Sequence, residues 1–363
     1  MTHLSDILDP VALDQQVADG YIRMQRHPTL PLRIHNYTDR CVYDNVWTLE
    51  TTTCRGLIVS DDDEIISRCL TKFWSLSQHE IAGTAHEIPW DEPFRCYAKL
   101  DGSMGQMFPT PDGYEIATRG SFTSDQAIHA TRVWKERYEP TCRPDPRFSY
   151  IMEIVYPANR IVVDYKGRDD LWLLGAVEIE TGMTISPDDA RRSLLGWTGP
   201  QAYEWDQSRY HNMGQGDDPE NEEGFVLWFP KSDFRLKAKF ATYLRLHRLM
   251  TGTSSKTIWR CLVEGREDEL AELPDELHPF ATKMADSLKR DFSLIETEAQ
   301  RLAWIVTPMK LRKDQAKYVL SHAAGRTVAG VTFALLDGKD PSAAIWKAVE
   351  PEFVAPFGNV EAE

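Results

Sequence analysis

Residues 96–108, CYAKLDGSMGQMF, contain the stretch that decides the fold, Lys99-Leu100-Asp101-Gly102-Ser103. The Asp-Gly pair predicts a tight turn directly after strand-forming residues, which presents the Lys99 side chain at the end of a strand. A neutral lysine amine is a nucleophile, and the phosphoramidate that it forms with a nucleotide is a high-energy donor. A pattern as short as K-x-D-G also occurs on ordinary surface turns. Other segments must therefore support the interpretation of Lys99 as a nucleophile that attacks a nucleotide.

Two acidic segments follow in the order that nucleotide transfer requires. Residues 149–157, SYIMEIVYP, predict a buried strand with one carboxylate, Glu153, which is costly to bury unless it meets a metal, a ribose hydroxyl or a cation. Residues 220–229, ENEEGFVLWF, place Glu223 and Gly224 before an apolar run. The carboxylate is suited to hold Mg²⁺, and the glycine lets a ligand approach the backbone. A core-edge glutamate and an acidic loop are the alternative interpretations.

A basic segment completes the order. Residues 234–247, FRLKAKFATYLRLH, place Lys237 and Lys239 on one face of a strand, where their charges repel unless an anion such as a triphosphate lies beside them. A solvated strand face is the alternative for this segment alone. The joint appearance of all four segments favours nucleotidyl transfer.

The four segments, together with LLGAVEI, resemble motifs I, III, IIIa, IV and V of the covalent nucleotidyltransferases, which include ATP-dependent ligases and capping enzymes. Residues 36–59 and 70–80 narrow the choice, because they resemble the N-terminal region of phage-type RNA ligase 1, a family that reseals broken tRNA. In that family an arginine and a lysine in these elements clamp ATP phosphates. The resemblance assigns those roles here to Arg55 and Lys72, with Trp74 at the aromatic position.

The resemblance implies a full set of site residues. For two of them the sequence leaves an alternative: Arg55 could pair with the acidic run 61–64, and Tyr243 could be an ordinary helix tyrosine that packs on Leu246 or His247. Adenine would lie between Val226 on one side and Leu174 or a neighbour on the other. The predicted catalytic residues are Lys99, Asp101, Lys237 and Lys239, and the predicted metal ligands are Asp101, Glu153 and Glu223. The predicted nucleotide contacts are Arg55, Lys72, Trp74, Lys99, Gly102, Arg119, Glu153, Leu174, Glu223, Gly224, Val226, Lys237, Lys239 and Tyr243.

The implied reaction joins an RNA 5′-phosphate to a 3′-hydroxyl through a lysyl-AMP intermediate at Lys99, with ATP and Mg²⁺ (alternatively Mn²⁺). We expect Lys99 to be kept neutral by Lys237, Lys239 and Arg55. The expected substrate is nicked tRNA, and the expected state is a monomer. Two alternatives stay open: a capping-type or DNA-joining nucleotidyltransferase, and a non-catalytic RNA-end sensor.

Composition is consistent with an intracellular enzyme. The net charge of −15 argues against tight nonspecific RNA binding, so a local basic groove is expected instead. The 6 cysteines form no C-x-x-C pair and predict a reduced set without a zinc site. No apolar stretch has transmembrane length and the N-terminus lacks signal-peptide features, so we expect a cytoplasmic protein, in the host cell if a phage encodes it.

The predicted fold class is α+β in two domains. Residues 1–245 should form an adenylyltransferase domain of antiparallel sheets with flanking helices, and residues 246–363 an all-helical domain that could select tRNA. Apolar residues from Phe280 to Val306 recur at helical spacing and predict one long helix. Predicted strands include residues 32–37, 53–59, 94–100, 150–155, 160–165, 224–229 and 235–240. Lys310, Arg312, Lys313 and Lys317 are candidate tRNA contacts, or a solvated helix start.

Overall fold

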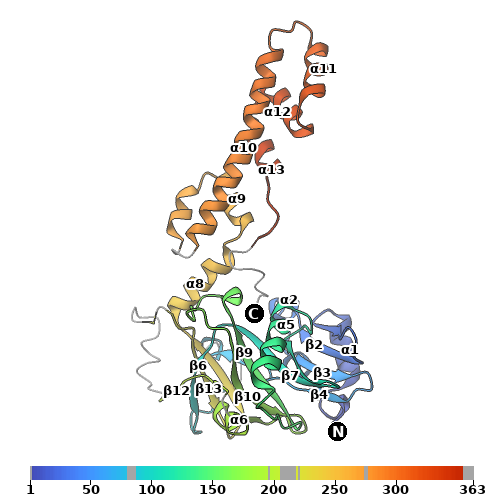
Figure 1. Cartoon of the computed structure of the whole chain (residues 1–363), viewed down its shortest axis with the longest axis vertical. Helices are drawn as coiled ribbons and strands as arrows, with labels where there is room; N and C mark the ends of the chain where they lie inside the picture. Colours follow the sequence, from blue (N-terminus) through green and yellow to red (C-terminus); the bar gives the residue numbers. More distant parts are fainter. Residues whose placement is uncertain are drawn as a thin grey trace. The chain divides into compact units, whose positions relative to one another are not determined.

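The computed structural model describes residues 2–79, 87–194, 197–204, 218–219, 221–273 and 277–354. The chain divides into two units, Met1–Arg245 and Leu246–Glu363. Strands and short helices make up the first unit, whereas the described residues of the second unit contain helices and no strand (Figure 1). The predicted α+β fold class is therefore confirmed. No helix in the described ranges is both long enough and apolar enough to cross a membrane.

The first sheet has the order β1-β2-β3-β4 and is antiparallel throughout. Its strands are β1 (Ile22–Arg26), β2 (Leu32–Tyr37), β3 (Arg55–Ser60) and β4 (Ile65–Ser67). Apolar side chains of β1 and β3 pack with α1 (Pro10–Ala18) and with the short helix η1 (Leu4–Asp6). The sheet is irregular at Gly56, where the β2–β3 register shifts and φ is +97°. This bulge lies beside Arg55, a predicted site residue.

The predicted strand over 53–59 begins later than expected. Residues Leu49–Thr53 form α3 instead, because Thr48 and Thr51 make a reciprocal capping box at its start. Arg55 is consequently the first residue of β3. The helix α2 (Asp39–Tyr43) precedes α3 and is capped by the Thr38 side chain.

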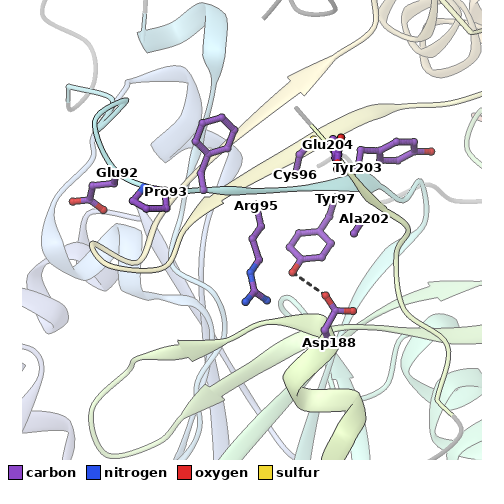
Figure 2. Close-up of a pocket in the computed structure, with 10 residues that line it drawn as sticks. Glu92, Pro93, Arg95, Cys96, Tyr97, Asp188, Ala202, Tyr203 and Glu204 are labelled. Atoms are coloured by element: carbon purple, nitrogen blue, oxygen red, sulfur yellow. Dashed lines mark hydrogen bonds between the residues drawn. The ribbon is translucent and has the colours of Figure 1, made fainter. Parts of the chain in front are cut away.

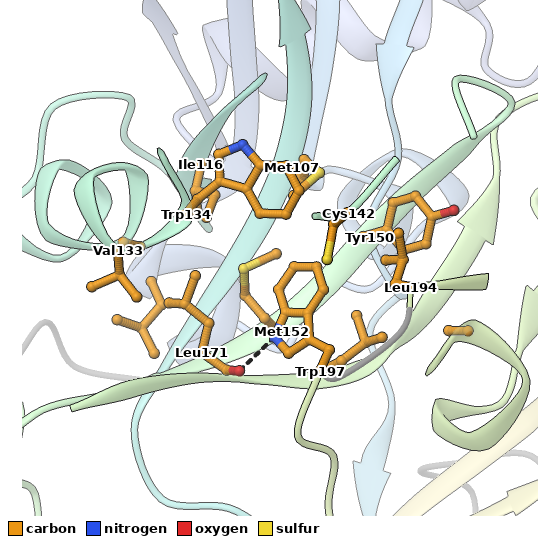
Figure 3. Packing of buried hydrophobic residues seen from close by; sticks show 14 of the residues in the cluster. Met107, Ile116, Val133, Trp134, Cys142, Tyr150, Met152, Leu171, Leu194 and Trp197 are labelled. Atoms are coloured by element: carbon orange, nitrogen blue, oxygen red, sulfur yellow. Dashed lines mark hydrogen bonds between the residues drawn. The ribbon is translucent and has the colours of Figure 1, made fainter. Parts of the chain in front are cut away.

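The second sheet has the order β11-β10-β9-β7-β8, again antiparallel. Its strands are β7 (Ser103–Thr110), β8 (Gly113–Thr118), β9 (Phe148–Val155), β10 (Asp170–Glu178) and β11 (Thr184–Ile185). One face packs on α5 (Asp125–Val133), η2 (Trp134–Tyr138) and α6 (Pro187–Ser193). Trp134 and Trp197 stack at 5.5 Å in this core, and the Trp197 indole donates a hydrogen bond to the Leu171 carbonyl (Figure 3).

The third sheet has the order β12-β6-β13-β14-β5. Its strands are β5 (Trp74–Ser75), β6 (Arg95–Lys99), β12 (Ala202–Tyr203), β13 (Gly224–Phe229) and β14 (Phe234–Lys239). Only the β14–β5 pair is parallel among these strands, and it places Ser75 opposite Lys237. The helix α4 (Leu76–His79) follows β5, and α8 (Ala241–Gly252) follows β14.

The predicted strand over residues 160–165 is wrong. The segment is an irregular loop that follows η3 (Pro157–Asn159), although Ile161, Val162 and Val163 are buried. Two of its backbone N–H groups bind the Asp101 carboxylate, so they are not available for a sheet partner. The apolar run therefore reflects burial rather than strand pairing.

The second unit is built around α10 (His278–Val306), which confirms the predicted long helix. Its buried face includes Ala285, Leu288, Ala299 and Leu302. The other elements are α9 (Ser255–Val263), η4 (Glu267–Glu272), α11 (Arg312–His322), α12 (Arg326–Leu336) and α13 (Ser342–Ala348). All 6 cysteines of the chain are free and buried, as the sequence predicts for a reduced set: Cys41, Cys54, Cys69, Cys96, Cys142 and Cys261.

Two leucines of α10 provide a matched test of this helical core. Leu302 is 0% exposed and packs with Val328, Val331 and Ile345, whereas Leu294 is 64% exposed. We expect Leu302→Ala to lower the free energy of unfolding by about 2–5 kcal/mol, because it leaves a cavity. Leu294→Ala should change it by less than about 0.5 kcal/mol. Denaturant unfolding followed by helical circular dichroism measures both, and equal effects would contradict the assigned buried face.

Candidate active site

Lys99 ends β6, and the strand register places two predicted site residues in line with it. Gly224 of β13 lies opposite Lys99 on one side and opposite Lys239 of β14 on the other. Because residues aligned across a sheet point to the same face, the two lysines share a face, and period two adds Val226 and Lys237 to it.

Lys99, Gly224 and Lys239 form a row of aligned residues across the sheet, and Gly224 is the member that must lack a side chain. Its φ is +143°, and an added Cβ would lie 2.0 Å from the Ala238 carbonyl oxygen. Any L-residue with a side chain would therefore displace the β13–β14 pairing at this point.

The Glu223 carboxylate joins the two lysines. Its side chain is 0% exposed, and the Lys99 ammonium lies 2.9 Å from it. The Lys239 ammonium lies 2.8 Å from the same carboxylate, and both lysine side chains are largely buried. A buried carboxylate requires such compensation, and here two cations share one anion.

The sequence expectation that neighbouring cations keep Lys99 neutral stays a prediction. The Glu223 carboxylate lies 2.9 Å from the Lys99 ammonium, and the Lys239 cation contacts the same carboxylate, so Lys99 meets charges of both signs. The sequence analysis assigned Glu223 to the metal and the nucleotide and did not predict its contact with Lys99. Lys99 can act as a nucleophile only after its proton has been removed.

Asp101 lies in the turn after β6 and is 3% exposed. One carboxylate oxygen accepts hydrogen bonds from the N–H groups of Val162 and Val163, both at 2.8 Å, and the other accepts one from the Tyr243 hydroxyl at 2.7 Å. Burial, and next the charge of Glu223, raise the pKa of Asp101 to about 6, although these hydrogen bonds oppose the shift. Tyr165 adds a further contact by accepting a hydrogen bond from the Asp101 backbone N–H at 2.7 Å.

Glu153 lies beside this turn on β9 and is 7% exposed. A Cβ on Gly102 would come within 2.6 Å of the Ile154 carbonyl oxygen and 3.1 Å of the Glu153 Cγ, so the glycine allows the turn to pack against β9. Burial raises the pKa of Tyr165, and the charges of Asp101, Glu153 and Glu223 add to the increase. The charges of the three predicted acidic residues thus all act on the Tyr165 phenol.

These carboxylates do not by themselves make a metal centre. Within the described ranges, no group of three or more His, Cys, Asp or Glu side chains could hold a metal ion. Mg²⁺ commonly takes one or two carboxylates and completes its shell with phosphate oxygens and water, so a nucleotide-borne ion does not require such a group. The Glu223 carboxylate already contacts two ammonium groups, so an ion bound there would share it with these cations.

The predicted phosphate-binding cations gather around an aromatic residue that the sequence analysis did not single out, Tyr37. Arg119 donates a hydrogen bond to the Tyr37 hydroxyl at 3.1 Å, and the Lys72 ammonium lies 5.6 Å from the ring centre. Burial alone would raise the pKa of Tyr37, but the charges of Arg55, Arg119 and Lys72 outweigh it and lower that pKa. Three cations therefore act on one buried phenol.

Trp47 is the second aromatic residue that sequence reasoning missed. The Lys72 ammonium lies 5.0 Å from its ring, and Trp74 lies 6.0 Å from it, edge to face. Both Tyr37 and Trp47 fall within the segment that resembles phage-type RNA ligase, which was the available signal.

The predicted adenine residues lie on different sheets. Leu174 sits at the β-bulge of β10 and packs with Cys69, Ile151 and Val177, whereas Val226 lies between Tyr97 and Lys237 in the third sheet. An adenine site between Leu174 and Val226 stays a prediction.

A cavity of about 620 Å³ lies on β6, and its lining residues include Arg95, Tyr97 and Asp188 (Figure 2). Arg95, Tyr97 and Lys99 alternate along the strand, so all three point to one face of the sheet. The Tyr97 hydroxyl donates to the Asp188 carboxylate at 3.3 Å.

Comparison with known proteins decides the family. The RNA ligase family model matches residues 53–243, which is more than half of the 363 residues. This chain belongs to the RNA ligase family. The predicted family and enzyme class are thereby confirmed, and the match spans the predicted site from Arg55 to Tyr243.

Two viral relatives resemble the RNA ligase described here. The RNA ligase of Rhodothermus phage RM378 is 23% identical over 396 aligned positions, which cover 88% of this chain and 89% of that protein. A putative bifunctional polynucleotide kinase/RNA ligase of Autographa californica nuclear polyhedrosis virus is 24% identical over 243 positions. That match covers 61% of this chain and only 34% of the viral protein, so the chain spans about a third of this relative.

Solved structures are more distant. An archaeal ATP-dependent RNA ligase is 14% identical with a TM-score of 0.45, and the match covers 80% of each chain. A Naegleria gruberi RNA ligase with PPi is 19% identical with a TM-score of 0.33, over 43% of this RNA ligase and 52% of that chain.

The shared carboxylate can be tested in the RNA ligase by an isosteric change. We expect Glu223→Gln to lower the free energy of unfolding by about 3–5 kcal/mol, because it leaves two buried ammonium groups facing each other without an anion. Glu222→Gln, at the exposed neighbouring position, removes the same charge and should have little effect. Thermal and denaturant unfolding measure both variants. Similar stability of the two would show that Glu223 is not the anion that compensates the lysines.

Proposed function

We propose that the protein is an ATP-dependent RNA ligase that seals nicked tRNA through covalent AMP on Lys99. Family membership supports the class of reaction. The observation that carries the residue assignment is the buried row in which Lys99 and Lys239 share the Glu223 carboxylate. A non-catalytic RNA-end sensor has no need of a buried lysine held in this way, and the match to the RNA ligase family disfavours a capping or DNA-joining enzyme.

In the first step, the neutral Lys99 amine attacks the α-phosphorus of ATP. A bond forms between nitrogen and phosphorus, the bond to the bridging oxygen breaks, and pyrophosphate leaves. Glu223 is the carboxylate in contact with the Lys99 ammonium, so we assign it the role of relieving Lys99 of its proton as the nucleotide enters. Lys239, and Lys237 two residues before it, then face the phosphates and offset their charge.

Two further steps complete the seal. The RNA 5′-phosphate attacks the phosphorus of the Lys99-bound AMP, which frees Lys99 and gives an RNA-adenylate. The RNA 3′-hydroxyl then attacks the activated 5′-phosphate, and AMP departs with the electrons of the broken bond. Arg119 is assigned to the entering phosphate, and Arg55 and Lys72 to the phosphates of ATP.

A divalent ion, Mg²⁺ or Mn²⁺, supplies charge neutralisation at the phosphates when it is bound. Glu223 and Glu153 are the residues assigned to hold it. Asp101 is the third predicted ligand, and both of its oxygens accept hydrogen bonds from the protein. We assign Asp101 to positioning: it ties the turn after Lys99 to the loop at Val162 and to Tyr243.

The natural substrate, the site of action and the assembly state are further parts of the proposal. Nicked tRNA is the substrate, the enzyme acts as a monomer in the cytoplasm, and that cytoplasm is the host cell's if a phage encodes the protein. The helical unit is assigned to tRNA selection, because Lys310, Lys313 and Lys317 are exposed at the start of α11. Arg312 is paired with Asp337, which leaves it a structural role as well.

The covalent step is tested with α-labelled ATP and a divalent ion. We expect the protein to form a labelled lysyl-AMP adduct and Lys99→Ala to lose it completely, because no other amine occupies the position of the nucleophile. Lys231→Ala is the matched control, since Lys231 lies in the turn between β13 and β14 with its side chain 78% exposed, and it should label normally. A labelled Lys99→Ala protein would disprove the nucleophile, and preferential labelling with GTP would support a capping enzyme.

The role of the helical unit is tested by charge reversal. We expect Lys310→Glu with Lys313→Glu to reduce sealing of a nicked tRNA anticodon loop about tenfold or more, because two phosphate contacts become repulsive. Lys99 adenylylation and circularisation of a short linear RNA should persist. Lys283→Glu with Lys339→Glu makes the same change in net charge at exposed positions elsewhere in this unit. If both pairs impair tRNA sealing equally, overall charge rather than the start of α11 is responsible.

A further inference from the structure

Tyr37 and Trp47 lie against the cations to which the proposed function assigns the phosphates. Tyr37 is 5% exposed at the end of β2, and Trp47 lies in the loop between α2 and α3. Their ring centres are 5.2 Å apart, edge to face. We propose that these two rings are positioning residues of the ligase, which hold the side chains of Lys72 and Arg119 ready for phosphate. The inference rests on the proposed phosphate-binding role of those two cations.

Lys72 is held by ring faces. Its ammonium lies 5.0 Å from the Trp47 ring centre and 5.6 Å from that of Tyr37, within the range of cation–π attraction. A lysine side chain loses rotamer entropy when a ligand fixes it, so a side chain that is already confined loses less on binding. The faces of the two rings therefore confine the Lys72 side chain before an anion binds.

Arg119 is held by the same phenol in a different way. It donates a hydrogen bond to the Tyr37 hydroxyl at 3.1 Å, and its guanidinium carbon lies 5.0 Å from the ring centre. Gly56 also approaches the backbone of Arg119 closely, since a Cβ on Gly56 would come within 3.3 Å of the Arg119 carbonyl oxygen. The first sheet thus lies against both the side chain and the backbone of Arg119.

The loop that carries Trp47 is itself well anchored. The indole N–H donates to the Asn45 side chain at 2.9 Å, and the Val46 carbonyl accepts from the Thr51 hydroxyl at 3.0 Å. Asn45 has a φ of +53°, a conformation that asparagine tolerates better than most residues. The ring therefore occupies a defined position before any ligand arrives.

A double-mutant cycle between Trp47 and Lys72 tests the inference. The readouts are the ATP concentration for half-maximal Lys99 adenylylation and the maximal rate. We expect Trp47→Leu to raise that concentration about 2- to 30-fold, the range that a cation–π contact is worth, with a smaller change in maximal rate. Trp47→Phe, which keeps a ring face, should recover most of the loss. In a Lys72→Ala background, Trp47→Leu should add nothing further.

Tyr37→Phe tests the hydroxyl separately, since it keeps the ring but removes the acceptor for Arg119. Its effect should become smaller in an Arg119→Ala background, where the hydroxyl keeps its interaction with Arg55. Trp304→Leu, at a tryptophan that is 79% exposed, controls for the loss of an indole, and thermal unfolding of every variant controls for folding.

The cycle distinguishes failure of the positioning role of Trp47 from failure of the proposed phosphate role of Lys72. An unchanged effect of Trp47→Leu in the Lys72→Ala background would overturn the positioning role while leaving the phosphate role of Lys72 intact. A normal ATP dependence of Lys72→Ala would overturn both, because Lys72 would then not bind the nucleotide. The nucleophile assignment is tested separately, by the loss of the labelled adduct in Lys99→Ala.

Discussion

The Glu223 carboxylate, buried between two ammonium groups, is the constraint on which the rest of this site depends. A charge that is 0% exposed must have its counter-ions within contact distance, and only the row formed by β6, β13 and β14 brings Lys99 and Lys239 to it together. Gly224 is required in this row because its backbone lies too close to β14 for any side chain. The positions of Lys99, Lys239 and Glu223 are thus fixed by one strand register.

The loop between β9 and β10 secures the turn that follows Lys99. Glu223 disfavours a second negative charge nearby, and Asp101 is compensated by N–H groups of Val162 and Val163 and by the Tyr243 hydroxyl. Two of these three donors come from a loop whose N–H groups have no strand partner. The first sheet joins the site through Arg55, which lies 3.1 Å from the Met104 sulfur, and Met104 is aligned with Glu153.

Sequence alone predicted the parts of this site that follow from local pattern. Period two placed Lys237 and Lys239 on one face, and the apolar runs located β2, β13 and the long helix α10. It could not predict the Lys99–Glu223 ion pair, because the two residues are 124 positions apart in the sequence. Their contact depends on the order of strands in the sheet. The loop at Val162 was misjudged because burial and strand pairing leave the same apolar pattern. Tyr37 and Trp47 were missed because an aromatic residue near a cation carries no signal until both are located in space.

The burial of every cysteine has a practical consequence for studying this molecule. All 6 thiols are free and buried, and burial raises the pKa of five of them, Cys41, Cys54, Cys69, Cys142 and Cys261. Thiolate is the reactive form, so the native thiols should react slowly with maleimide reagents. A single cysteine placed on the surface, for example by Tyr43→Cys at a position that is 88% exposed, would accept a fluorophore selectively without removal of the native ones. Substrate binding and sealing could then be measured by fluorescence in a protein that keeps all of its native cysteines.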